Sequence, residues 1–224
     1  MATGALALLA DGRFPSGGHA HSAGWEAAQK LLRLDDTAAL RSFIDGRLAT
    51  VGLTEAAFVA AIIHQLDASG SIAWDEVDDE VDARIASPIA RRTSRSLGRQ
   101  WVRAARSIWR GESFALPAGE GDPHQIAAFA CVAAHVGITP EDAVRLHLHH
   151  LVATITTAAV RLQGFDPFAI QRLQFDLLES TDRIVDDALS WQRVPWSELP
   201  ASSGPLADQL IEHHATWDLR LFQS

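Results

Sequence analysis

Apolar residues recur at helical spacing along most of the chain, and no convincing run of alternating β-branched residues interrupts them. Ala, Leu, Arg and Gln, which favour helices, are frequent. We therefore predict an all-α, single-domain helical bundle of about ten helices. The predicted helices span residues 3–10, 22–32, 37–49, 52–68, 75–86, 88–110, 123–136, 140–162, 167–189 and 205–215.

Several of these helices begin with a recognisable capping sequence. Thr139 precedes Pro140 and two acidic residues, an order that suits the first turn of a helix. Asp122-Pro123 and Asp166-Pro167 repeat this order, and Asp36 precedes another predicted start. Stretches 111–122 and 194–205 are rich in Gly, Pro or Ser and are predicted to be flexible loops. No linker divides the chain, so we expect residues 1–224 to form one domain.

The composition argues against several classes of protein. The 224 residues carry a net charge of -9, which opposes binding to nucleic acid or to an anionic membrane. Cys131 is the only cysteine, so an internal disulfide is excluded, and its apolar neighbours indicate a core position. No run of about 18 apolar residues indicates a membrane span. The segment 4–10 lacks the basic flank of a signal peptide, and we expect a cytoplasmic protein.

The common enzyme motifs are absent from the sequence. There is no GxxxxGK[ST] loop for a nucleotide phosphate, no GxGxxG, no GxSxG and no HExxH. The sequence therefore predicts no enzymatic activity of these kinds and no tightly bound cofactor.

The helix predicted at 88–110 has one apolar and one basic side. An angle of 100° per residue groups four apolar residues: Leu97, Trp101, Ala104 and Ile108. The opposite side carries Arg95, Arg99, Arg106 and Arg110. Two interpretations stay open. The arginines form a docking stripe for an acidic protein, or the acidic run 75–82 covers them within the same chain.

Some of the ten histidines have spacings that suit metal binding. His147 and His150 share a helix face, and with an acid such as Asp142 they could serve a helical metal-dependent hydrolase. Ordinary hydrogen-bonded side chains are the competing interpretation. His19 and His21 lie in a turn rich in glycine, where they could point into a groove.

That turn belongs to the most informative stretch, residues 13–26, which reads RFPSGGHAHSAGWE. It resembles the N-terminal motif of the UreF family of urease accessory proteins, LPxGGFSYSxGLE. The segments 82–84 and 92–99 are similar to the family's acidic-then-SxxxGR helix, and 158–162 to the end of its long central helix. Residues 214–224 are similar to its HE…SRLFxS ending. The matches keep the family's order.

The chain departs from the family pattern at three places. His19 and His21 replace the aromatic residues of FSYS, and residues 163–167 replace P-L-G-Q. Ala215 stands where the family has a glutamate after the C-terminal histidine. These changes indicate a divergent branch of the family.

The resemblance implies an all-α homodimer without activity of its own. Such proteins assemble with UreD, also called UreH, and with the GTPase UreG, which they recruit and regulate. The complex delivers nickel to the urease apoprotein, so nickel passes through it. The tail 206–224 is expected to bind a partner, becoming ordered against UreD.

The resemblance and the turn together define the candidate residues. In the turn, we expect partner binding by Phe14, Pro15, Gly17, Gly18, Ser22, Gly24 and Glu26. The basic helix contributes Arg95, Arg99 and Arg103, and the tail contributes Arg220, Leu221 and Phe222. His19 and His21 are candidates for a nickel route. The alternatives are the helical metal-dependent hydrolase and, opposed by the net charge, a nucleic-acid binder.

Overall fold

The computed structural model describes residues 2–110, 114–115 and 121–223, and these residues confirm the all-α prediction. They contain no β-strand beyond one isolated bridge between His21 and Gln223. Three short helical turns are Gly18–Ala20 and Trp196–Glu198, both 3-10, and Leu48–Gly52, a π-turn. The α-helices are α1 Ala2–Ala10, α2 Trp25–Leu32, α3 Thr37–Arg47, α4 Leu53–Ser69, α5 Trp74–Arg84, α6 Pro88–Ile108, α7 Gln125–His135, α8 Pro140–Gln163, α9 Pro167–Asp176, α10 Leu178–Ser190 and α11 Pro205–Ala215.

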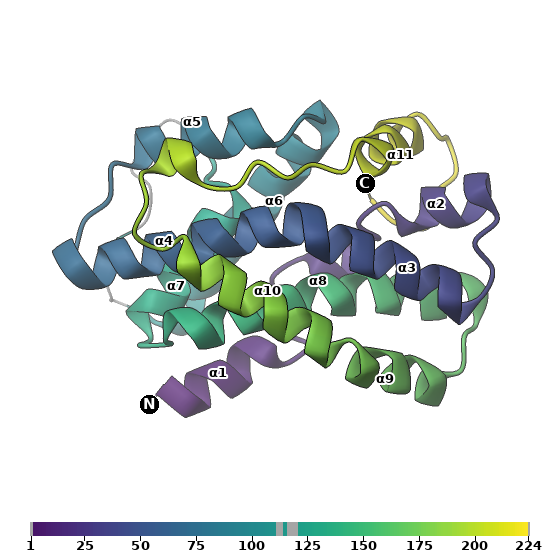
Figure 1. The fold of residues 1–224 in the computed structure, drawn as a ribbon, viewed down its shortest axis with the longest axis horizontal. Helices are drawn as coiled ribbons and strands as arrows, with labels where there is room; N and C mark the ends of the chain where they lie inside the picture. Colours follow the sequence, from purple (N-terminus) through teal and green to yellow (C-terminus); the bar gives the residue numbers. More distant parts are fainter. Residues whose placement is uncertain (1, 111–113, 116–120, 224) are drawn as a thin grey trace.

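Helix α4 lies at the centre of the bundle. It packs against α7, α8 and α10, and α7 also packs against α6 (Figure 1). Four of its alanines, Ala56, Ala57, Ala60 and Ala61, are buried, and they let neighbouring helices approach closely around the large side chains of the core. Those large, fully buried side chains include Trp25, Phe58, Ile62, Trp101 and Phe129.

Helices α3 and α4 form one continuous helix, whereas the sequence predicted a break near residue 50. The π-turn at Leu48–Gly52 keeps the backbone helical between α3 and α4, so no loop separates them. The combined helix, Thr37–Ser69, is long and apolar enough to cross a membrane, but 61% of its most apolar window is buried inside the fold. The helix therefore resembles the core helix of a packed domain.

Two further helix boundaries differ from the prediction. The predicted helix 167–189 is divided at Leu177, which is buried and separates α9 from α10. No Gly or Pro marks this break, so it comes from packing. The predicted helix 22–32 begins only at Trp25, because Ala23 and Gly24 adopt positive φ angles of 51° and 89°.

The capping predictions held at three of four helix starts. Asp36, Thr139 and Asp166 each accept a hydrogen bond from a backbone N–H of the first turn. Asp122 does not cap α7, because it pairs with Arg99 and His124 occupies the cap position. Most of the predicted loop 111–122 lies outside the described residues.

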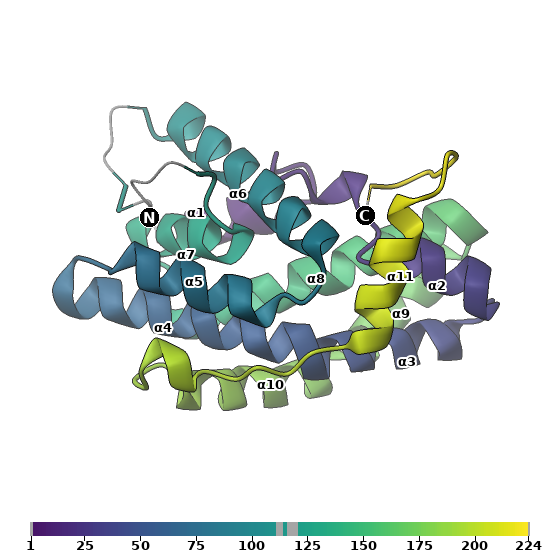
Figure 2. The ribbon, with the colours of Figure 1, turned by 90° about the horizontal axis from the view of Figure 1, so that it is seen from above.

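The connection 194–204 includes the 3-10 turn Trp196–Glu198 and runs past α5 and α4 toward α11 (Figure 2). The guanidinium of Arg84 donates hydrogen bonds to four of its backbone carbonyls, at 3.0–3.2 Å: those of Trp196, Ser197, Leu199 and Pro200. Thr54 donates a further bond to the carbonyl of Ser202. These contacts fix the path of the segment, and its predicted flexibility stays a prediction.

Candidate functional site

The turn that follows α1 takes its shape from glycine. Gly17 and Gly24 have φ values of 86° and 89°, a region that side chains with a Cβ disfavour. A Cβ on Gly17 would also lie 3.1 Å from Leu97 Cδ2 of α6. Phe14 is buried against Trp101, with ring centroids 4.8 Å apart. The turn is therefore pressed against α6 in one conformation.

Glu26, in the first turn of α2, is fully buried and anchors the C-terminal segment to this turn. Its Oε1 accepts hydrogen bonds from Lys30 Nζ at 3.0 Å and from the backbone N–H of Leu221 at 3.1 Å. Its Oε2 accepts from the N–H of Phe222 at 2.9 Å and from His214 Nε2 at 3.0 Å. A carboxylate is tolerated in the interior only when its oxygens are satisfied in this way.

The charge state of this anchor follows from its surroundings. Burial alone would raise the pKa of Glu26, but its hydrogen bonds from Leu221, Lys30, Phe222 and His214 outweigh burial and lower it. Burial lowers the pKa of His214, and the hydrogen bond to Glu26 only partly opposes this. An ionised Glu26 therefore accepts from a neutral imidazole.

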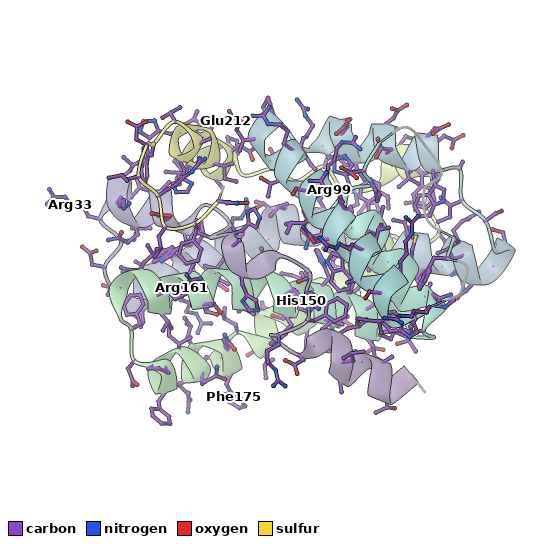
Figure 3. All side chains as sticks on the ribbon, turned by 180° about the vertical axis from the view of Figure 1, so that it is seen from behind. Arg33, Arg99, His150, Arg161, Phe175 and Glu212 are labelled. Carbon is purple, nitrogen blue, oxygen red and sulfur yellow. The ribbon has the colours of Figure 1, made fainter. Side chains whose placement is uncertain are left out.

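The end of the chain lies directly along the turn. Gln223 donates its backbone N–H to the carbonyl of Ala20 at 2.6 Å. Phe222 is buried, and the guanidinium of Arg161 lies 4.6 Å from its ring centroid. Arg161 also donates to the carbonyl of His19 at 3.2 Å. Figure 3 shows Arg161 of α8 beside this C-terminal segment.

Helix α11, which leads into the tail, is held by a residue that sequence reasoning missed. Glu212 Oε1 accepts from Ser87 Oγ at 2.5 Å and from the backbone N–H of Ile89 at 2.9 Å. The hydrogen bond from Ser87 is the main cause that lowers the pKa of Glu212. Glu212 thus joins α11 to the start of α6, next to the turn.

The turn and the tail present one continuous outer surface, which we call the composite surface. Among the predicted site residues, Phe14, Ser22, Gly24, Glu26 and Phe222 are buried, so they shape this surface without lining it. Leu219 and Leu221 are 88% and 55% exposed, an unusual exposure for large apolar side chains. The exposed side chains of the composite surface include Pro15, His19, Asp218, Leu219, Arg220 and Leu221.

The predicted basic stripe on α6 is partly covered by the chain itself. Arg95 pairs with Asp78 at 2.7 Å and with Asp82 at 2.9 Å, both from the acidic run of α5. Arg99 pairs with Asp122. Arg103 is exposed and forms no ion pair within the described part of the chain. The acidic run of α5 therefore covers Arg95, as one of the two interpretations predicted, whereas the side chain of Arg103 is exposed to solvent.

A second network, centred on buried His124, joins α5 and α6 to the start of α7. His124 is fully buried; its Nε2 donates to Asp82 Oδ1 at 2.9 Å, and Ser94 Oγ donates to its Nδ1 at 3.0 Å. Burial lowers the pKa of His124. Asp78, Asp82 and His124 are the one group of metal-donor type among the described residues, but Arg95 binds both carboxylates. The network therefore acts as a structural link.

The SxxxGR motif at Ser94, Gly98 and Arg99 is the sequence signal that could have indicated this contact between α6 and the start of α7. Ser94 Oγ also accepts from the N–H of Gln125, and a Cβ on Gly98 would lie 1.9 Å from the carbonyl oxygen of Pro123. The serine, the glycine and Arg99 therefore all contact the segment that begins α7.

His147 and His150, the candidates on α8, each have their own hydrogen-bond partner. His147 Nε2 donates to Glu55 at 3.0 Å, and His150 Nε2 donates to the carbonyl of Leu9 at 2.9 Å. Asp142 instead interacts with Thr139 at the start of α8. These contacts support ordinary hydrogen-bonded histidines and do not assemble the hydrolase site.

His19 and His21, the candidates for a nickel route, also differ in their surroundings. His19 is exposed, with Nε2 facing the carbonyl of Gly12, whereas His21 is buried. Cys131 is buried as predicted, and burial raises the pKa of its thiol. It is therefore unsuited to act as a thiolate ligand.

A central cavity of about 160 Å³ lies beneath the turn. It reaches from the turn to α4, α6, α8 and α11, and it is closed in part by the connection 194–204. Both apolar and polar side chains line it. His21, Glu55, His147 and His150 border it, together with Arg47 and Asp208, which no sequence pattern had indicated.

Comparison with known proteins connects these features to one family. A model of the UreF family matches residues 26–178. The chain is 37% identical over 225 residues to the urease accessory protein UreF of Mycobacterium marinum, covering 98% of this chain and 97% of that protein. It is 35% identical over 210 residues to that of Mycobacterium tuberculosis, covering 93% and 92%. For Mycobacterium sp. strain JLS the identity is 34% over 220 residues, covering 98% and 97%.

Proposed function

The chain belongs to the UreF family of urease accessory proteins, and on that premise we propose that it is a non-enzymatic scaffold for urease maturation. It joins UreD/UreH in the cytoplasm, recruits or regulates the GTPase UreG, and so serves nickel insertion into the urease apoprotein. The observation that carries this proposal is the anchoring of Leu221 and Phe222 by buried Glu26. These hydrogen bonds bring the N-terminal motif, residues 13–26, and the C-terminal motif, residues 214–224, together at one surface.

The composite surface is suited to protein binding. It combines two exposed leucines with the cation of Arg220, on a backbone held by the turn glycines and by Glu26. Exposed apolar side chains beside an arginine are typical of interface hot spots. Leu219, Arg220 and Leu221 are therefore our proposed partner contacts, and Arg103 extends the surface along α6.

We propose the exposed face of α9 as the homodimer contact. Phe168 and Phe175 are 85% and 64% exposed, and Leu178, the first residue of α10, is 53% exposed. Figure 3 shows Phe175 projecting away from the body of the molecule. Large aromatic side chains in such positions favour burial against another copy.

A nickel route past His19 and His21 is the finer part of the proposal. His19 is exposed on the composite surface, and His21 borders the cavity beneath it. Two imidazoles that span the surface and the interior would give a divalent metal successive donors. Nickel is cargo in this proposal, and no tightly bound cofactor is expected.

Co-expression with UreD/UreH and UreG tests the scaffold function. We expect the unmodified chain to form a three-component complex that survives size exclusion. The double variant L219D/L221D should lose at least one partner, because it places two charges at the proposed contact. The matched control is Ile108→Asp, which changes an exposed apolar residue at the end of α6. Failure of the unmodified chain to associate with either partner would refute the proposal.

The nickel route needs a separate test. Urease maturation at limiting nickel should fall in the His19→Ala/His21→Ala variant, while the three-component complex still forms. The control is His213→Ala, an exposed histidine on α11. Normal maturation by the double variant would remove the nickel route and leave the scaffold proposal intact.

A further inference from the structure

The central cavity is bordered by a cation, Arg47, that forms no hydrogen bond or ion pair with any described residue. We propose that this cavity binds a small organic monocarboxylate, anchored by the guanidinium of Arg47. This ligand site goes beyond the scaffold function and does not depend on it.

Arg47 is the last residue of α3, and its side chain borders the cavity. Its Nε is buried and has no hydrogen-bond partner. Burial lowers the pKa of Arg47, and the charges of Glu55 and Asp208 oppose this effect. Within the described residues, however, neither acid forms an ion pair with it. Arg47 as a whole is half-buried, but its Nε is a buried donor without an acceptor, which is costly, so an anionic oxygen would complete its environment.

Several other charged or titratable groups that border the cavity already have partners within the fold. Arg84 donates to the backbone carbonyls of the connection 194–204, and Glu55 accepts from His147. His150 donates to the carbonyl of Leu9, and burial lowers its pKa to about 4, so it is neutral near pH 7. Arg47 is therefore the cation available to a ligand in the described lining.

The negative groups near Arg47 restrict the charge of that ligand. Glu55 and Asp208 both contribute negative charge at Arg47. Burial and the charge of Glu212 raise the pKa of Asp208, whereas Arg47 lowers it, so the two acids together partly offset the positive charge of Arg47. A dianion such as a phosphate would be repelled more strongly than a monocarboxylate. The carboxylate can form two parallel hydrogen bonds with the guanidinium.

The rest of the ligand must be apolar and compact. The cavity measures about 160 Å³, close to the roughly 150 Å³ that accommodates benzene in an engineered protein cavity. Its apolar lining comes from several helices: Val51, Phe58, Leu97, Ile126, Leu151 and Ile211. Benzoate combines a ring of this size with one carboxylate, so it is a suitable probe.

Calorimetric titration of the full chain with benzoate tests the site, with benzyl alcohol as a neutral probe of similar size. Benzoate should bind and raise the melting temperature, while benzyl alcohol should bind much more weakly. In Arg47→Gln the affinity for benzoate should fall by at least about tenfold, the loss expected for a charge-assisted hydrogen bond. The matched control is Arg33→Gln at the exposed end of α2, which should bind benzoate normally (Figure 3).

Circular dichroism shows whether Arg47→Gln folds. If it does not, a second variant tests the same site. Val51→Phe fills the cavity and leaves Arg47 unchanged, so it should also abolish benzoate binding. Equal binding of benzoate and benzyl alcohol would overturn the proposal. Unchanged benzoate affinity in a folded Arg47→Gln or Val51→Phe variant would overturn it too, as would no benzoate binding at about 10 mM, above the millimolar range expected of weak ligands.

Discussion

The backbone N–H of Phe222 donates a hydrogen bond of 2.9 Å to the carboxylate of Glu26, although 196 positions separate the two residues in the chain. Glu26 recognises the tail through backbone groups, so the tail side chains remain available for other contacts. This explains how Leu221 can be anchored at its N–H and still expose its side chain.

Replacing Glu26 by Gln should loosen the tail. The amide NH₂ would face one of the N–H donors that the carboxylate now accepts, leaving that donor unsatisfied. We expect a loss of about 2 to 3 kcal/mol in the free energy of unfolding, the range for hydrogen bonds to charged groups. Urea denaturation measures the loss, and hydrogen exchange should show faster exchange at Leu221 and Phe222. Glu179→Gln, at an exposed position on α10, serves as the control; equal exchange in both variants would contradict the anchor.

The stability of the protein should decrease as the pH is lowered from 6.5 toward 4. Burial lowers the pKa of His150 from 6.5 to about 4, so the unfolded chain binds a proton in this range that the folded chain excludes. This one group contributes up to about 3 kcal/mol of stability at neutral pH. His124 and His214, whose pKa values burial also lowers, act in the same direction.

Urea denaturation at several pH values measures this dependence. His150→Gln retains a donor for the carbonyl of Leu9 but does not titrate, so its stability should fall less steeply with decreasing pH. His213→Gln, at an exposed position, should keep the full dependence. Identical pH profiles for His150→Gln and the unmodified chain would show that His150 is not the group responsible.

Gly98→Ala should destabilise the contact between α6 and α7. The added Cβ would lie 1.9 Å from the carbonyl oxygen of Pro123, so backbone must move. We expect a loss of about 3 kcal/mol or more, as for overpacking in a core. Gly46→Ala is the matched helical control: nothing lies within 4 Å of its Cβ position, and the exchange should stabilise α3 by up to about 1 kcal/mol. Similar unfolding midpoints for the two variants would contradict the close approach of α6 and α7.

Arg84→Gln should release the connection 194–204. The guanidinium donates to four carbonyls of this segment, and the shorter amide can replace only part of that set. Limited digestion with chymotrypsin should then cut faster after Trp196. Arg92→Gln, an exposed position on α6, should be cut at the original rate. If Arg84→Gln is equally resistant, other contacts hold the segment.

Local features of the structure could be predicted from the sequence. The caps at Asp36 and Thr139 involve groups three residues apart, and burial of Cys131 follows from its apolar neighbours. The acidic run of α5 was recognised as a possible cover for the basic stripe, and Arg95 is indeed paired with it. The break at Leu177 was missed because no helix-breaking residue marks it.

The candidate site was predictable only in part. The turn and the tail were both recognised by their resemblance to one family, but nothing in either segment indicated that Glu26 would bind the N–H groups of Leu221 and Phe222. The sequence did not indicate Arg47 as a site residue. The cavity that it borders is formed by α8, α11 and the connection 194–204, which come together only in the folded chain.

The sequence by itself determined the helical class, most helix starts and the family, because periodicity, caps and motifs are properties of neighbouring residues. Only the tertiary structure decided which motif residues are exposed, which arginines are paired and where the tail lies. These outcomes depend on burial and hydrogen bonding between residues up to 196 positions apart, and such pairings form only when the helices pack.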